Sequence, residues 1–390
     1  MATIPKMTCT AGLYLHIPFC TQRCSYCDFY FVTAQRGQDA FVNALCTELS
    51  LGACEYPDVQ VSTVYLGGGT PSRLPGSSIA HIMEHLNATY NLRQVREVTL
   101  EMNPEDLTPD GLAALRSCGI TRVSLGIQSF FDDELAFMNR AHSADCALQA
   151  ARYVAQAGFE SWTMDLIFGL PGQSLDRWEA NLKRAMAFSP PHISTYNLTI
   201  EPNTPLHKQV RLGQIVPARD DDVADAYQAA MDHLREAGYE HYEVSSFARA
   251  GHQAQHNRGY WTHSNYLGFG PSAHSFWWQS DIARRWSNVR NLRQYTENLA
   301  AGKGPPLELD EILSAADLAK ERIMLGLRTA EGLCLHTLAN TYGVDLAFSQ
   351  SAELARLAAE GMIIRTEGIV RLTDRGRHVC DTITTRLLPD

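Results

Sequence analysis

Residues 12–31 read GLYLHIPFCTQRCSYCDFYF, and three cysteines fall within this stretch as C-x3-C-x2-C: Cys20, Cys24 and Cys27. The apolar run that precedes them, residues 13–17, has the composition of a strand. Pro18 then ends regular strand pairing because it has no backbone N–H. We therefore expect the cysteines on a loop at the C-terminal end of a strand, where barrels of the TIM type carry their chemistry.

Three thiolates suit a cubane iron–sulfur cluster that leaves one iron open, since four cysteines are the usual closed arrangement. A zinc site is the competing metal interpretation, but it needs four ligands, commonly in C-x2-C pairs. No second pair exists in the sequence. A third interpretation is that three unrelated cysteines are simply buried. The seven other cysteines show no metal spacing and are interpreted mostly as packing residues.

The composition describes an ordinary soluble globular chain. Its 390 residues predict two or more domains, with 45% apolar and 19% charged residues. A net charge of −10 argues against nucleic-acid binding through phosphate contacts. No apolar run approaches the ~20 residues of a membrane-spanning helix, and the N-terminal residues show no signal pattern. We therefore expect a cytosolic protein whose cysteines are thiols or cluster ligands rather than disulfides.

Short apolar runs alternate with longer amphipathic stretches through residue 200. The expected strands are residues 13–17, 63–66, 97–101, 122–126, 161–168 and 192–198. Such alternation predicts a parallel sheet with helices between its strands. The fold class is therefore α/β, an incomplete (β/α)6 barrel of the TIM type.

The cysteine stretch resembles the radical SAM superfamily, whose open iron is chelated by the amine and carboxylate of S-adenosylmethionine (SAM). Tyr26 matches the aromatic residue that the superfamily places before its last cysteine. The lead-in Y-x-H-I-P-F-C and the exit Y-C-D-F resemble a narrower branch, that of oxygen-independent coproporphyrinogen III oxidases and HemW-type heme chaperones. Two later segments, residues 256–261 (HNRGYW) and 268–275 (GFGPSAHS), resemble the HemW-type members.

The resemblance also implies a SAM site at the strand ends. Three glycines, 67–69, would let a ligand approach the backbone closely. An aspartate within the apolar strand 161–168 would be costly unless it were hydrogen-bonded or at the rim. Arginine suits the SAM carboxylate through its guanidinium geometry. The residues implied to bind SAM are Tyr14, Tyr26, Gly68, Gly69, Thr70, Glu101, Gln128, Arg140, Asp165 and Ile167.

The pattern changes after residue 205. We expect a radical SAM core in residues 1–205, a HemW-type extension in 206–307 and a winged-helix-like module in 308–390. The module ends in two alternating strands around a turn, residues 361–373. A winged helix often binds DNA, but the acidic chain favours a structural or partner-docking role.

Three functions remain open: a heme chaperone, a coproporphyrinogen III oxidase, or another radical SAM enzyme. Oxidase relatives continue their motif as C-x3-C-x2-C-x-C, whereas Phe29 stands at the last of these positions. The chaperone is therefore favoured, coproporphyrinogen dehydrogenase activity is not expected, and no catalytic residue is assigned. SAM cleavage stays possible in principle.

His256, which opens the HNRGYW segment, is the candidate heme ligand, because imidazole is a common axial ligand. The alternative is a hydrogen-bonded structural histidine beside core aromatic residues. The expected cofactors are a 4Fe–4S cluster, SAM and heme. The expected partners are heme and a heme-acceptor protein, for example a respiratory one, with no nucleic acid. We expect at most peripheral membrane contact and allow for a homodimer.

Overall fold

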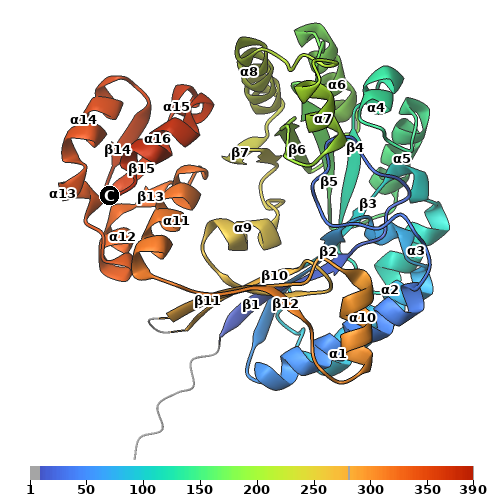
Figure 1. Ribbon diagram of the computed structural model, residues 1–390. Helices are drawn as coiled ribbons and strands as arrows, with labels where there is room; N and C mark the ends of the chain where they lie inside the picture. The colour runs from blue at the N-terminus through green and yellow to red at the C-terminus, as the bar shows by residue number, and fades with distance from the viewer. Residues whose placement is uncertain (1–8, 280–281, 390) are drawn as a thin grey trace, which may run out of the picture.

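A computed structural model describes residues 9–279 and 282–389 of the chain. It is built on a twelve-stranded sheet in the order β12-β11-β10-β9-β1-β2-β3-β4-β5-β6-β8-β7. Strands β1 to β6 run parallel to one another. They are β1 (Thr10–Ile17), β2 (Gln60–Gly68), β3 (Glu97–Met102), β4 (Arg122–Gln128), β5 (Ser161–Phe168) and β6 (His192–Asn197). The expected α/β fold with a parallel barrel-like sheet is confirmed, and Figure 1 shows it curving around a central space.

Helices return the chain from each strand to the next and lie outside the curve of the sheet (Figure 1). They are α1 (Gln38–Glu55), α2 (Gly76–Thr89), α3 (Pro109–Ser117), α4 (Asp132–Phe137), α5 (Ala144–Gln156) and α6 (Leu175–Ala187). Two short 3-10 turns, Pro71–Arg73 and Pro104–Asp106, follow β2 and β3. Several helices begin at a side-chain cap: Ser143 and Ser174 accept hydrogen bonds from the first turns of α5 and α6.

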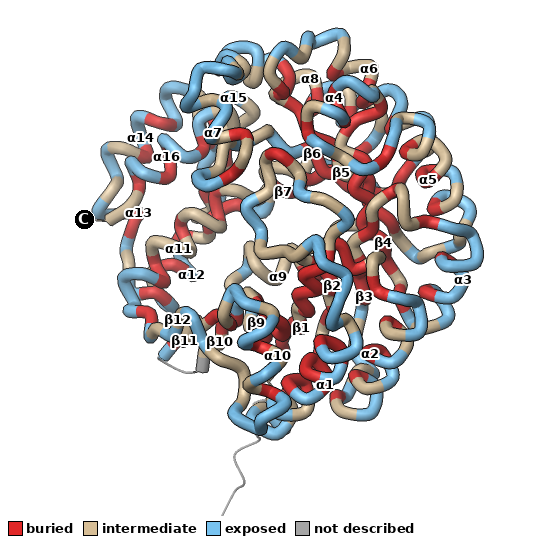
Figure 2. Tube along the Cα trace, turned by 45° about the vertical axis from the view of Figure 1, so that its right-hand side comes forward, coloured by how far each residue is buried: buried red, intermediate tan, exposed pale blue. Residues whose placement is uncertain are grey.

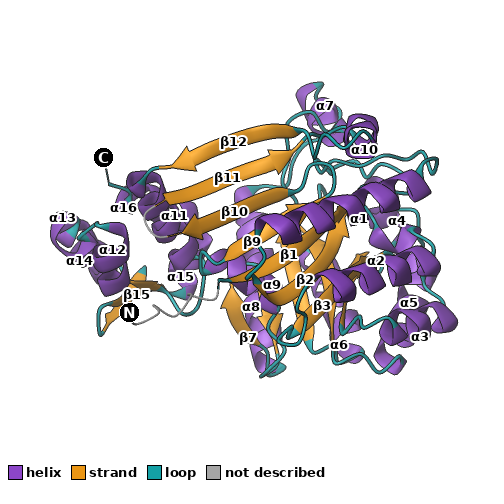
Figure 3. Cartoon of the chain, turned by 90° about the horizontal axis from the view of Figure 1, so that it is seen from below, coloured by secondary structure: helices purple, strands orange, loops and turns teal. Residues whose placement is uncertain are grey.

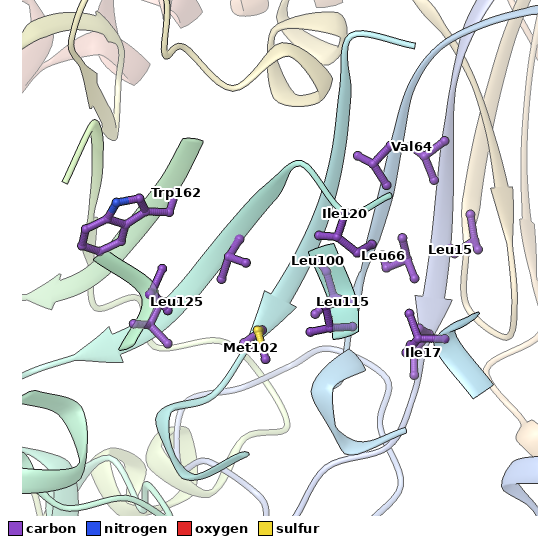
Figure 4. Packing of buried hydrophobic residues seen from close by; sticks show 14 of the residues in the cluster. Leu15, Ile17, Val64, Leu66, Leu100, Met102, Leu115, Ile120, Leu125 and Trp162 are labelled. Atoms are coloured by element: carbon purple, nitrogen blue, oxygen red, sulfur yellow. The ribbon is translucent and has the colours of Figure 1, made fainter. Parts of the chain in front are cut away.

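Alternate residues of the central strands face opposite sides of the sheet. Leu13, Leu15 and Ile17 of β1 are fully buried. Figure 4 shows Leu15 and Ile17 in one packed layer with apolar residues of β2, β3 and β4. The intervening Tyr14 and His16 point to the other side, toward the barrel interior. Buried residues accordingly concentrate in the strands of the barrel (Figure 2).

The segment after residue 205 enters the same sheet at both edges. β7 (Glu240–Glu243) and β8 (Ser246–Ala248) extend it beyond β6, and β8 runs antiparallel to β6. At the other edge, β9 (Asn265–Phe269) lies parallel to β1. Antiparallel β10 (His274–Gln279), β11 (Ile282–Asn288) and β12 (Leu307–Leu313) continue from it. Figure 3 shows these three strands reaching away from the barrel toward the C-terminal helices.

Four helices belong to this segment: α7 (Pro205–Arg211), α8 (Asp220–Glu236), α9 (Gln255–Trp261) and α10 (Leu292–Ala300). α8 packs on α6, where the buried Trp178 indole donates to the Ala226 carbonyl at 2.8 Å. α9 lies on the concave side of the sheet (Figure 1). The expected extension therefore completes the sheet of the core, and its boundaries at 206 and 307 stay a prediction.

The C-terminal part has its own hydrophobic core and a three-stranded antiparallel sheet, β13 (Leu333–Cys334), β15 (Ile369–Leu372) and β14 (Ile363–Thr366). β14 and β15 form a hairpin whose turn residues, Glu367 and Gly368, both have positive φ angles, 52° and 76°. The helices are α11 (Ala315–Leu327), α12 (Leu335–Tyr342), α13 (Leu346–Ser349), α14 (Ser351–Ala359), α15 (Asp374–His378) and α16 (Cys380–Leu387). This agrees with the expected winged-helix-like module.

Within the described residues, every helix is too short or too polar to cross a membrane. Residues 1–8, which formed part of the argument for a cytosolic protein, lie outside the described part of the chain.

Candidate functional site

The three cysteines lie on a loop that leaves β1 and is closed at its base by backbone hydrogen bonds. Cys20 N–H donates to the Val32 carbonyl at 2.9 Å, and Val32 N–H donates to the Pro18 carbonyl at 2.7 Å. Phe19 is fully buried and packs edge-on against Phe41 of α1, with ring centroids 5.4 Å apart. The loop is therefore anchored where it begins and ends, as expected for a loop that holds a rigid group.

The middle of this cluster loop is attached to the neighbouring strand ends. Ser25 N–H donates to the Met138 carbonyl at 3.0 Å, and its hydroxyl donates to the Phe137 carbonyl at 3.1 Å. On the other side, Thr70 N–H donates to the Phe19 carbonyl at 2.8 Å. The loop thus spans from the end of β2 to the segment that follows β4.

All three thiols are partly buried and close enough to influence one another. Burial raises the pKa of Cys20 to about 11 and that of Cys27 to about 12, and repulsion by Cys24 adds to both shifts. The Thr70 hydroxyl lies 3.5 Å from the Cys20 sulfur, and Arg140 Nη1 lies 3.5 Å from the Cys24 sulfur. A bound cation would offset the cost of three thiolates in one site.

The three partly buried thiols all come from the cluster loop. In residues 9–279 and 282–389, no group of three His, Cys, Asp or Glu side chains could hold a metal ion. Zinc would need its ligands at about 2.0–2.3 Å from one centre. A cubane cluster instead distributes its cysteines over separate irons. Three thiols on one loop are the donor set that the sequence predicts for a cluster with one open iron.

The glycine run at the end of β2 fits closely against the base of the cluster loop. Gly68 has a φ of 108°, and a Cβ there would lie 2.5 Å from Nδ1 of His16. A Cβ on Gly69 would lie 2.7 Å from the carbonyl carbon of Pro18. Both positions therefore require glycine, the first for its backbone and the second for its lack of a side chain.

Glu101 and Asp165 extend from β3 and β5 toward the barrel interior. Glu101 accepts hydrogen bonds from the Tyr65 hydroxyl at 2.7 Å and from Gly68 N–H at 3.1 Å. Burial, with repulsion by Asp165, raises the pKa of Glu101 to about 7. Asp165 accepts from the Ser124 hydroxyl at 2.8 Å, and burial raises its pKa as well. A cationic ligand group would relieve this pair, because it favours both ionised carboxyls.

A polar chain joins the cluster loop to the strand ends through Arg140. Its Nη2 donates to Oδ1 of Asn103 at 2.6 Å and to the Gly126 carbonyl at 3.0 Å. Asn103 in turn donates to the Thr70 hydroxyl at 3.2 Å. The Nε of Arg140 is buried and has no hydrogen-bond partner among the residues that the structure describes. An unsatisfied buried donor is costly, and a carboxylate at this place would satisfy it.

Gln128, Tyr26 and Ile167 complete the rim of this cluster-side site. Gln128 has a φ of 64°, unusual for a residue other than glycine, where the pairing of β4 with β5 shifts register. Its Nε2 would lie 2.9 Å from a Cβ on Gly126, so that glycine leaves room for it. Tyr26 packs with Ile167 in a small apolar cluster beside the loop.

The structure thus brings the predicted SAM residues to one end of the barrel, next to the cysteines. Tyr14 lies deeper in the barrel and stacks on Tyr65 with ring centroids 6.1 Å apart. Two residues that were not assigned from the sequence, Asn103 and Tyr65, hydrogen-bond to these side chains. Asn103 lies in the segment E-M-N-P that singled out Glu101, and Tyr65 follows the alternation of β2, so both signals were present.

His256 lies apart from the cluster loop, buried against the barrel wall. Its Nδ1 lies 2.8 Å from the Thr63 hydroxyl and its Nε2 lies 2.9 Å from the Tyr260 hydroxyl. The ring stacks on Tyr65 at 5.1 Å, and burial lowers its pKa to about 3. Both ring nitrogens are occupied, as expected for the alternative of a hydrogen-bonded structural histidine.

Two protein-family models match this chain and indicate its class. Residues 14–185 match the model of the radical SAM superfamily, and residues 313–379 match the HemN C-terminal domain. In fold, the chain is similar to the coproporphyrinogen III oxidase HemN from Escherichia coli. The TM-score is 0.82 at 24% identity, over 98% of this chain and 90% of that chain. At this identity the likeness shows the fold alone.

The full-length relatives narrow the family. The heme chaperone HemW of Mycobacterium tuberculosis (strain CDC 1551 / Oshkosh) is 37% identical over 97% of this chain and 94% of the relative. HemW of Bacillus subtilis (strain 168) is 32% identical over 93% of this chain and 95% of the relative. The chain belongs to the HemW family of radical SAM proteins.

Proposed function

We propose that this protein is a heme chaperone with a radical SAM core, which binds heme and delivers it to an acceptor protein. The names of its relatives support this role. The observation that carries it is Phe29, two residues after Cys27, at the position where the oxidase relatives have a further cysteine. Its side chain is 65% exposed and supplies no metal ligand.

In this proposal Cys20, Cys24 and Cys27 hold a 4Fe–4S cluster. A cluster with one open iron supplies a coordination position for SAM. Arg140 binds the SAM carboxylate, since its buried Nε lacks a partner. The backbone of Gly68 and Gly69 and the Glu101 carboxylate receive the SAM amine. The remaining residues of the set, Tyr14, Tyr26, Thr70, Gln128, Asp165 and Ile167, line the rest of the SAM site.

His256 stays a proposed heme ligand, but iron binding would cost it one of its two side-chain hydrogen bonds. Iron could bind its Nδ1 only after the Thr63 contact is broken, or its Nε2 only after the Tyr260 contact is broken. Each broken contact leaves a buried hydroxyl without its partner, at about 1–3 kcal/mol.

We also propose roles for the three parts of the chain, and a location and an assembly state for the whole protein. Residues 1–205 form the cofactor-binding core, 206–307 the extension and 308–390 a module that docks a partner. The protein works in the cytosol as a monomer or homodimer, touches membranes at most peripherally and does not bind nucleic acid.

The test compares two reactions of one anaerobically reconstituted preparation. Heme-loaded protein is mixed with the apo form of a b-type cytochrome, and we expect the Soret band to move to that of the holo acceptor. The same protein with SAM, reductant and coproporphyrinogen III should yield no protoporphyrinogen IX. Retention of heme in the first reaction would contradict delivery. Robust decarboxylation in the second would establish the oxidase instead.

A further inference from the structure

A cavity of about 370 Å³ lies beside the cluster loop, which contributes Asp28, Phe29 and Tyr30 to its walls. Tyr14, Tyr30, Tyr260 and Tyr266 contribute to its walls, from β1, the cluster loop, α9 and β9. The exposed Phe29 also lines it. Walls of this composition suit a flat, largely apolar ligand that stacks on aromatic rings.

Two histidines line this aromatic cavity, and their hydrogen bonding differs. His16 is occupied at both ring nitrogens, by the Tyr14 hydroxyl at 3.2 Å and the Tyr30 carbonyl at 2.8 Å. His274 has no hydrogen bond or ion pair in the part of the chain that the structure describes. His274 therefore presents a free imidazole to the cavity.

The backbone around His274 is held firmly, which fixes the place from which its side chain extends. Asn288 N–H donates to the Ala273 carbonyl at 2.9 Å. The Ser275 hydroxyl accepts from Gly268 N–H at 2.8 Å, and His274 pairs with Ser287 across β10 and β11. Because this backbone is already ordered, ligand binding does not have to order it.

The charges around His274 favour its neutral, metal-binding form. Burial, with the nearby Arg285 and Arg290, lowers the pKa of His274, whereas Glu308 opposes the shift. Arg290 also lines the cavity, where it donates from Nη2 to the Asp28 carbonyl at 2.9 Å. Its guanidinium has further donors and can bind a carboxylate.

We propose that this aromatic cavity is the heme site and that His274, in place of His256, supplies the axial imidazole to the heme iron. Tyr30, Tyr260, Tyr266 and Phe29 pack against the porphyrin, and Arg290 pairs with a propionate. The proposal deepens the chaperone function above and rests on it. It also places the cargo against the cluster loop, because residues 28–30 follow Cys27 directly and line the cavity.

Anaerobic heme titrations of the cluster-loaded protein test the assignment. His274→Ala should shift the Soret band and weaken heme binding by at least about tenfold, as expected when a metal site loses a ligand interaction. Added imidazole should restore the band position of the bound heme. Phe29→Ala should weaken binding without moving the band, since it removes packing and leaves the iron ligand in place.

His81→Ala is the matched control, since His81 is exposed on α2, and it should bind heme like the unaltered chain. His256→Ala tests the competing ligand, with cluster iron content as the check of folding. An unchanged band and affinity in His274→Ala would overturn the inference, whichever result His256→Ala gives. If the unaltered chain takes up no heme, the proposed function itself fails.

Discussion

At the scale of single residues, the proposed cluster depends on sulfur ligands from a loop that is otherwise held by backbone contacts. Loss of one thiolate should leave the loop in place but not the cluster. After anaerobic reconstitution, we expect the unaltered chain to bind about four irons and Cys24→Ala to lose them. The control is Cys54→Ala, because Cys54 is an exposed thiol on α1. Equal iron in Cys24→Ala and the control would refute the assignment.

In the proposed SAM site, Arg140 acts through charge and not through iron ligation. Arg140→Ala removes the buried guanidinium that joins Asn103, Gly126 and the cluster loop. We expect SAM binding to weaken by about 10- to 100-fold, because charge-assisted hydrogen bonds contribute about 1.5–3 kcal/mol. Isothermal titration with reconstituted protein measures this, and iron content should stay unchanged. The exposed Arg152→Ala is the control, and SAM affinity equal to that control would remove Arg140 from the site.

At the scale of elements, the glycine run at the end of β2 and the cluster loop form one packed unit. Gly68→Ala adds a methyl group where His16 is 2.5 Å away and where φ is 108°. We expect the free energy of unfolding to fall by about 1–3 kcal/mol. The iron content of the reconstituted protein should fall with it. Gly213→Ala is a matched control, because Gly213 has a φ of 69° but no atom within 4 Å of its Cβ position. A similar loss of cluster in both variants would show that backbone strain alone is responsible.

The parallel core was predictable because its strands are short, apolar and separated by helical periodicity. The strands of the extension were not predicted, since their partners lie far along the chain. Tyr14 pairs in register with Gly268, for example, and no local pattern at either residue signals this pairing. Such long-range pairing depends on tertiary packing, which overrides local propensity.

The same distinction holds for the candidate site. The cysteines and the strand-end residues were predictable because motif spacing identifies them. The contacts of His256 with Thr63 and Tyr260 were foreseen only as the structural alternative, since they depend on how α9 crosses the barrel. The free imidazole of His274 was not predicted, because which histidines are hydrogen-bonded follows from the folded chain.

At the scale of the whole molecule, Glu48 joins the core to the extension. It is buried on α1 and accepts from Gly270 N–H at 2.7 Å, Asn288 Nδ2 at 2.6 Å and the Tyr295 hydroxyl at 2.6 Å. Burial raises its pKa from 4.5 to about 7. Its stabilising contribution is therefore full below pH 4.5 and is lost as the pH rises through about 7.

This linkage predicts a pH-dependent stability. Between about pH 5 and 8 the free energy of unfolding should fall by on the order of 2–3 kcal/mol at most because of Glu48. Glu48→Gln should flatten that fall, as measured by urea unfolding across the pH range. The exposed Glu84→Gln on α2 is the control and should follow the unaltered chain. An unchanged slope in Glu48→Gln would assign the pH dependence to other groups.

The most direct test of the central claim is an anaerobic titration of the full, cluster-loaded chain with heme. Its absorption spectrum is followed, and heme is counted after gel filtration. We expect saturable binding of about one heme per chain, with a Soret band distinct from that of free heme, because a protein ligand sets the electronic state of the iron. Absence of saturable binding by cluster-loaded protein would contradict the account.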